Sequence, residues 1–203
     1  HIAHHRQTPK NDLLTTLIDA NENGDVLTED ELISTVVVLL NAGHEATVHQ
    51  LGNAVKTILE SGISVRKLFE NEDSTAATVE ECLRIDAPLH MFTRYCLEDL
   101  TLEIDGATIN LKKGDEIGLL LGAANHDPRQ FQNPSLFDPD RPDQSNVTFG
   151  AGIHFCIGAP LARLELQVGL KTLFNRIPDL ELVEAPRYRD IFHFHGLEKV
   201  IIR

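Results

Sequence analysis

The segment FGAGIHFCIG, residues 149–158, decides how this chain folds. It places three glycines and one cysteine directly before a helix expected over residues 159–175. Glycine lets the backbone turn tightly and approach a flat ligand closely. The loop amides and the start of the helix favour negative charge on the sulfur of Cys156. The segment therefore predicts a loop that presents a thiolate to a metal, although an isolated cysteine is more often a buried structural residue.

The helix expected after this loop has apolar residues three or four positions apart on one face. These residues are Leu166, Leu170, Leu173 and Phe174. The spacing predicts that this face packs against the core.

Two helices are expected before residue 62. Residues 12–20 have helical spacing that stops at the polar turn NENGD. Thr28 and the acidic residues after it form a helix start for a long helix reaching about Ser61. Residues 36–40 are apolar on every side, which predicts that this long helix is central and buried.

The remaining segments mix helix and strand. A helix over residues 74–84 has to end before Pro88. Strands are expected over residues 101–104, 107–111 and 116–121, around the turn signals Asp105-Gly106 and Lys113-Gly114. Residues 125–145 should be irregular but ordered, and residues 180–203 should form a β-hairpin. The fold class expected from this pattern is α+β, mainly α.

Composition excludes several classes of protein. The chain has 203 residues, enough for one domain, and a formal net charge of −13, which argues against binding nucleic acid. The longest apolar stretch, residues 33–42, is too short to cross a bilayer. Cys82, Cys96 and Cys156 form no CxxC pair. A reducing, cytoplasmic location is expected.

The chain resembles the cytochrome P-450 family at four motifs in the family's order. The cysteine loop matches Phe-Gly-x-Gly-x-His-x-Cys-x-Gly at every fixed position. LNAGHEAT, residues 40–47, looks like the oxygen-binding segment of the family's central helix. Glu81 and Arg84 match its Glu-x-x-Arg motif, and FDPDRP, residues 137–142, is similar to the segment that precedes its cysteine loop.

The resemblance implies a haem b (iron protoporphyrin IX) cofactor, with Cys156 as the iron ligand in a loop running from Phe149 to Gly158. It also implies that Arg94 and His154 bind the haem propionates. Cationic or donor groups suit those carboxylates. Glu81, Arg84 and Arg141 correspond to a buried ion-pair triad that supports the loop.

The implied function is a haem-thiolate monooxygenase that inserts one oxygen atom from O₂ into a small organic substrate. A ferredoxin and a reductase are the implied electron donors. The implied catalytic segment is Glu45, Ala46 and Thr47, with Glu45 helping proton delivery. The family usually follows this acid with threonine, whereas Ala46 stands here, so Thr47, a water or a substrate hydroxyl has to substitute. Residues 90–92 and 191–194 fall where the family lines its substrate pocket.

The family is about twice as long as this chain. The part that has no counterpart here would lie before His1, so we expect residues 1–203 to form one portion of a haem-binding domain with the N-terminal half absent. Such a chain should expose core surface, associate through that face and hold haem weakly. Its activity would be impaired.

Other readings remain open. Residues 19–30 nearly fit a calcium-binding EF-hand loop, but Asp30 stands where the bidentate glutamate belongs and no second loop exists. His193 and His195 share one face of the expected strand and could bind a metal together, although no third ligand is identifiable. A haem carrier or sensor without catalytic activity is the third alternative.

Overall fold

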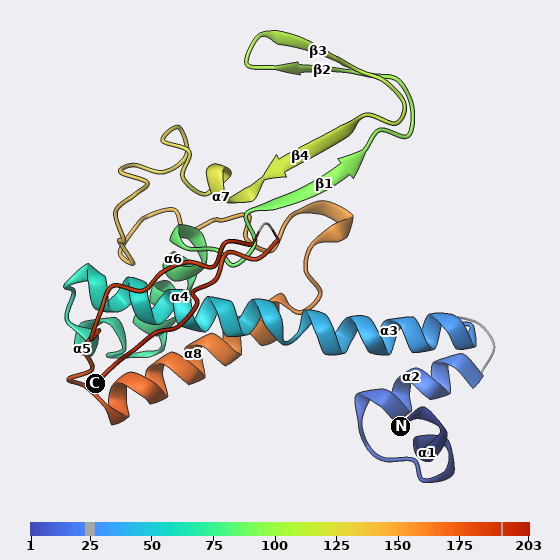
Figure 1. Cartoon of the computed structure of the whole chain (residues 1–203), viewed down its shortest axis with the longest axis horizontal. Helices are drawn as coiled ribbons and strands as arrows, with labels where there is room; N and C mark the ends of the chain where they lie inside the picture. The colour runs from blue at the N-terminus through green and yellow to red at the C-terminus, as the bar shows by residue number, and fades with distance from the viewer. Residues whose placement is uncertain (23–26, 192) are drawn as a thin grey trace. The chain divides into compact units, whose positions relative to one another are not determined.

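The computed structural model of this chain describes residues 1–22, 27–191 and 193–203 (Figure 1). These residues fall into two units, His1–Glu45 and Ala46–Arg203. The cysteine loop and every expected site residue except Glu45 belong to the second unit.

The first unit consists of α1 (Ile2–Gln7), α2 (Leu13–Glu22) and α3 (Glu29–Ala42). The helix expected over residues 12–20 is confirmed as α2. Thr28 caps α3 as its sequence indicates: its hydroxyl accepts from the Glu31 amide, and the Glu31 carboxylate accepts from the Thr28 amide. Leu32 of α3 and Ile18 of α2 are buried in this unit.

The expected single helix over residues 28–61 is wrong at Gly43. Helix α3 ends at Ala42, and a separate helix, α4, runs over Glu45–Ser61. The His44 amide donates to the carbonyl of Asn41, only three residues back, at 3.3 Å. Glycine has a low helix propensity, so a tight turn at this position costs little.

The expected burial of residues 36–40 is also wrong for this chain. Val38 is 60% exposed and Leu40 is 70% exposed. An apolar pattern on all sides of a helix indicates that something surrounds it, but it does not say which part of a protein does so. These side chains therefore form an exposed apolar face of α3.

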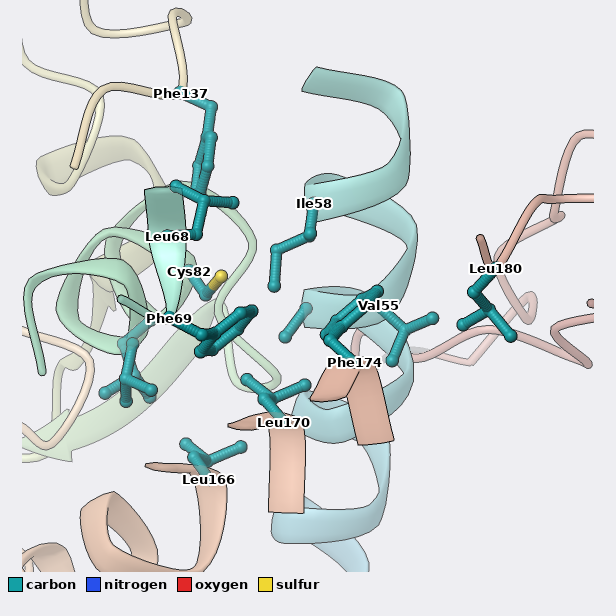
Figure 2. Close-up of a cluster of buried hydrophobic side chains, with 13 residues drawn as sticks. Val55, Ile58, Leu68, Phe69, Cys82, Phe137, Leu166, Leu170, Phe174 and Leu180 are labelled. Carbon is teal, nitrogen blue, oxygen red and sulfur yellow. The ribbon is translucent and has the colours of Figure 1, made fainter. Parts of the chain in front are cut away.

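The second unit holds the main core. Besides α4 it contains the helices α5 (Val65–Leu68), α6 (Glu72–Ile85), α7 (Leu121–Ala124) and α8 (Ala159–Arg176), and a short 3-10 turn, η1 (Gly152–His154). Figure 2 shows Leu170 and Phe174 of α8 pointing toward Val55 of α4. Phe174 also stacks on Phe69, with ring centroids 5.4 Å apart.

Local sequence signals set the ends of α6 and α8. Asn71 and Ser74 cap the start of α6 reciprocally, and the helix ends at Ile85, ahead of Pro88. Helix α8 starts directly after Gly158 with a proline in its first turn. Its buried residues are Ala159, Leu166, Leu170 and Phe174. The helices expected over residues 74–84 and 159–175 are thus confirmed, and so is the buried face of the second.

Two small antiparallel sheets follow α6. Strands β1 (Met91–Tyr95) and β4 (Glu116–Leu120) pair with Met91 opposite Leu120. Strands β2 (Leu100–Ile104) and β3 (Ala107–Leu111) form a hairpin. Asp105 and Gly106 both have positive φ at its turn, at 51° and 79°, as a two-residue hairpin of this type requires. The three expected strands are confirmed.

The C-terminal segment pairs less regularly than expected. Its described residues form two isolated antiparallel bridges, Leu182 with Ile202 and Tyr188 with Leu197. Pro186 lies between the two bridges and has no amide to donate, which interrupts the ladder. The expected hairpin is thus present as a paired loop without regular strands in the described part.

None of the helices within residues 1–22, 27–191 and 193–203 combines the length and the apolar character needed to cross a membrane.

Gly196 in this C-terminal segment packs directly against α4. A Cβ added at Gly196 would lie 1.9 Å from Nδ1 of the buried His49. We expect Gly196→Ala to lower the free energy of unfolding by about 1–3 kcal/mol, because the ring or the backbone has to move. Urea denaturation followed by circular dichroism measures this change.

Gly52→Ala in α4 is the matched control. A Cβ there would meet only a methyl group of Val200, at an ordinary 3.7 Å. Helix propensity should then raise the free energy of unfolding by about 0.5–1 kcal/mol. Equal effects of the two substitutions would contradict the steric explanation.

Candidate functional site

The cysteine loop turns on two glycines in left-handed conformations. Gly150 has a φ of 71° and Gly152 a φ of 69°, which other residues rarely adopt. These turns bring the Cys156 amide back to the Phe149 carbonyl, to which it donates at 2.9 Å. Helix α8 begins three residues after Cys156. The loop therefore holds the cysteine backbone by its own hydrogen bonds.

The three cysteines differ in what they can do. Cys82 and Cys96 are buried, and burial, reinforced by Glu81 and Asp86, raises the pKa of the Cys82 thiol well above its usual range. Cys82 therefore stays a protonated core residue. Cys156 is exposed and free, so it can offer its sulfur to a ligand.

The surroundings of Cys156 are apolar and uncovered. Ile153 is 97% exposed and Ile157 is 92% exposed. A Cβ on Gly158 would lie 3.8 Å from the Cys156 sulfur, and the glycine leaves that space open. One free thiol among exposed apolar side chains fits a flat, largely apolar group with a metal at its centre, as haem is.

Glu81 and Arg84 form a fully buried ion pair on α6. The Arg84 Nε and Nη2 donate to the two Glu81 carboxylate oxygens at 2.8 and 2.7 Å, and both side chains are 0% exposed. Arg141 adds a longer contact, with its Nη2 3.4 Å from Glu81 Oε1. The structure thus brings the three residues of the expected triad together.

The same groups bind the irregular segment ahead of the cysteine loop. Arg84 Nη1 donates to the carbonyls of Asn125 and Pro134 at 2.7 and 2.8 Å. The Asp138 amide donates to Glu81 Oε1 at 2.9 Å. Residues 125–145 are therefore irregular but ordered, as expected, because buried charges fix their backbone.

Asn125 is a site residue that the sequence analysis missed. It is completely buried; its side-chain amide donates to the Thr148 hydroxyl at 2.8 Å, and its side-chain oxygen accepts from the Val147 amide at 2.9 Å. It therefore connects Arg84 to the residues directly before Phe149. Its position at the start of a Pro- and Asp-rich segment predicts only an irregular region, and its complete burial is what distinguishes it.

The two expected propionate partners are exposed. Arg94 lies on β1 and donates to its neighbour's carbonyl at Thr93, at 2.9 Å. His154 ends η1 within the cysteine loop. Both side chains are accessible to a ligand, and their convergence on one cofactor stays a prediction.

The expected catalytic segment lies at the start of α4. Glu45 is exposed, while Ala46 and Thr47 are partly buried. Glu45 belongs to the first unit and the other two to the second. That these three residues face Cys156 stays a prediction.

A stack of three rings joins the C-terminal segment to the end of α6. The His195 ring lies between His90 and Tyr188, with centroid distances of 3.9 and 4.0 Å. Asp86 accepts from the Tyr188 hydroxyl at 2.6 Å and lies 3.2 Å from Nε2 of His195. Burial and the Asp86 hydrogen bond raise the pKa of Tyr188. The stack joins His90, the first residue of one expected pocket segment, to His195, which directly follows the other.

The alternative metal sites gain no support. His195 faces Asp86 and its stacked neighbours, and within the described residues no group of three or more His, Cys, Asp or Glu could hold a metal ion. The proposed calcium loop, residues 19–30, includes residues 23–26, which lie outside the described part of the chain. Phe192 of the expected pocket also lies outside it.

Comparisons with known proteins agree with the motifs. The family model "Cytochrome P-450" matches residues 70–178. The biotin biosynthesis cytochrome P-450 of Bacillus subtilis (strain 168) is 42% identical over 196 residues, covering 96% of this chain and 48% of that relative. The chain thus spans about half the length of the curated relatives it matches.

Solved structures show the same fold. P-450 BioI in complex with a hexadec-9Z-enoic acid ligated acyl carrier protein matches with a TM-score of 0.89 and 41% identity, over 99% of this chain and 50% of that one. The tirandamycin C-bound P-450 monooxygenase TamI matches with a TM-score of 0.89 and 36% identity, over 100% and 51%. The expected α+β fold is confirmed.

Removing the charge of Glu81 should destabilise the protein strongly. Glu81→Gln leaves two buried guanidinium groups without a carboxylate, so we expect the free energy of unfolding to fall by about 3–5 kcal/mol. Urea denaturation measures the change.

Glu184→Gln is the control for this substitution, because Glu184 pairs with Lys199 on the surface, where both side chains are more than half exposed. Its loss should change the free energy of unfolding by at most about 1 kcal/mol. A comparably small effect of Glu81→Gln would show that the buried network does not hold the fold.

His90 should make the stability of the protein depend on pH. Loss of water contact, and the charge of His195, lower the pKa of His90. The unfolded chain then binds this proton more readily than the native protein, so stability is lost as the pH falls below about 6.5. We expect the melting temperature of His90→Gln to fall less than that of the wild type between about pH 7.5 and pH 5.5.

Above about pH 7.5 the difference in melting temperature between the wild type and His90→Gln should be constant, because His90 is neutral there in both the folded and the unfolded chain. Parallel curves down to about pH 5.5 would contradict the lowered pKa of His90.

Proposed function

The chain belongs to the cytochrome P-450 family, and on this premise we propose that it is the haem-binding part of a haem-thiolate monooxygenase with Cys156 as the iron ligand. In the intact protein one atom of O₂ enters an organic substrate and the other leaves as water. The observation that supports this most directly is the free, exposed Cys156, held by backbone hydrogen bonds in a loop that keeps every fixed residue of the family pattern.

Each residue has a distinct task under this proposal. Bound haem supplies the oxygen chemistry. Cys156 presents its thiolate from a loop that its own amide holds closed on Phe149. Arg94 and His154, a cation and a hydrogen-bond donor, orient the cofactor through its carboxylates. Glu81, Arg84 and Arg141 support the loop through the backbone of the segment that precedes it.

Ala46 changes how protons reach the reacting oxygen. A threonine at this position would offer a hydroxyl, and alanine offers none. Glu45 then has to act through Thr47, an ordered water or a hydroxyl of the substrate. Reduced or substrate-assisted turnover follows for the intact enzyme.

The proposed partners are a small organic substrate and, as electron donors, a ferredoxin and a reductase. The net charge of −13 suits a protein without a nucleic-acid partner, and three cysteines without a CxxC pair suit a reducing, cytoplasmic setting. The exposed apolar side chains of α3 support association through that face.

A haem-binding protein without catalytic activity is the second candidate, and Ala46 is the residue that favours it. The two candidates differ in one measurement on the intact protein. A monooxygenase consumes oxygen in a substrate-dependent manner when supplied with electrons, and a haem carrier does not.

Haem binding by the purified chain tests the ligand directly. We expect the reduced, haem-reconstituted chain to give a thiolate-type carbonyl spectrum that is small or short-lived, because the apolar residues around Cys156 are uncovered and admit water. Cys156→Ala should abolish this spectrum.

Cys96→Ala is the control, since it removes a buried thiol and should leave the carbonyl spectrum unchanged. A spectrum that survives Cys156→Ala would refute the ligand assignment. A full and long-lived spectrum from the wild-type chain would contradict only the expectation that this chain holds haem weakly.

A further inference from the structure

Arg163 of α8 lies over the ring of Phe149, the first residue of the cysteine loop. Its guanidinium carbon is 4.6 Å from the ring centroid, well within the range of an attractive cation–π contact. The ring of Phe149 also packs against the main hydrophobic core. Phe149 is therefore held from two sides, by apolar side chains and by a cation.

Glu80 of α6 fixes the orientation of this guanidinium. Arg163 Nε donates to Glu80 Oε1 at 2.5 Å, and Nη2 donates to Oε2 at 3.1 Å. Two parallel charge-assisted hydrogen bonds hold a planar guanidinium more firmly than one bond does. Both side chains are partly buried, which weakens screening by salt.

The same pair reaches the backbone that positions Cys156. The Phe149 carbonyl accepts the hydrogen bond of the Cys156 amide at 2.9 Å. Glu80 Oε2 also accepts from the side-chain amide of Asn146 at 3.1 Å. Glu80 and Arg163 thus touch the segment 146–149 at both ends.

We infer that Glu80 and Arg163 are positioning residues that hold Phe149, and through its carbonyl the backbone of Cys156, in the geometry of the loop. They lie outside the Glu81 triad, although Glu80 is its neighbour on α6. This inference deepens the proposed function, because it concerns the placement of the cysteine that is assigned to haem.

The competing explanation is that the pair merely joins α6 to α8. Lys171 and Glu72 form a second ion pair between these two helices, with 3.3 Å between Nζ and Oε1. That pair makes no contact with the loop among the hydrogen bonds and ion pairs of the described residues. Lys171→Met is therefore the matched control for Arg163→Met.

Hydrogen exchange of the haem-free chain measures the effect at the loop. Arg163→Met removes the cation and keeps an unbranched apolar side chain in place of the stem of the arginine. We expect exchange of the Cys156 amide to speed up about two- to thirtyfold, the factor that corresponds to one cation–π contact. Amides in the middle of α6 and α8 should keep their wild-type rates, and Lys171→Met should leave the Cys156 amide unchanged.

Two further variants separate positioning from general stability. Arg163→Lys keeps a cation that Glu80 can hold but loses the planar group, so it should recover part of the protection at Cys156. Glu80→Gln is a smaller change than Arg163→Met, because the amide oxygen can still accept a hydrogen bond, and it should also speed exchange of the Cys156 amide. Combined with Arg163→Met it should add little, because both changes break one contact.

Unchanged exchange at Cys156 in Arg163→Met would overturn the inference, and so would an equal rise throughout α6 and α8. The carbonyl spectrum of the reconstituted variants gives a second, separate result, with a smaller thiolate-type fraction expected in Arg163→Met. If Arg163→Met speeds exchange at the loop but the wild-type chain gives no thiolate-type spectrum, the proposed function is contradicted while the positioning role is supported.

Discussion

A carboxylate removed from water has to be matched by cations and hydrogen-bond donors, and in this fold that carboxylate belongs to Glu81. Burying this charge without partners would lower the free energy of unfolding by several kcal/mol. Arg84 of α6 itself, and Arg141 and the Asp138 amide of the segment 137–142, supply the donors. The irregular segment 125–145 is ordered because its backbone groups form hydrogen bonds with the buried charged side chains of Glu81, Arg84 and Arg141.

The order imposed at Glu81 extends to the cysteine in a few steps. Arg84 binds the carbonyl of Asn125, whose side chain binds Val147 and Thr148. The next residue, Phe149, accepts the amide of Cys156. The exposed thiol is thus supported by a buried polar network, while the apolar side chains beside it in the loop are exposed. A rigid base and an open apolar face are what a bound planar cofactor requires.

Local signals explain what the sequence could predict. Spacing along α8, the glycines of the cysteine loop and the Asp105-Gly106 turn each depend on neighbouring residues alone. The bonds of Asn125 and Arg163 join segments that are far apart in the chain, and no local pattern encodes them. The apolar residues 36–40 predicted a buried central helix, whereas in this chain, which spans about half the length of its relatives, most of those side chains are exposed.

X-ray absorption at the iron edge of the haem-reconstituted chain would test the assignment of Cys156 most directly. The account predicts one sulfur neighbour of iron beside the porphyrin nitrogens, present in the wild type and lost in Cys156→Ala. Iron surrounded only by nitrogen and oxygen in the wild type, or a sulfur neighbour that remains in Cys156→Ala, would contradict it.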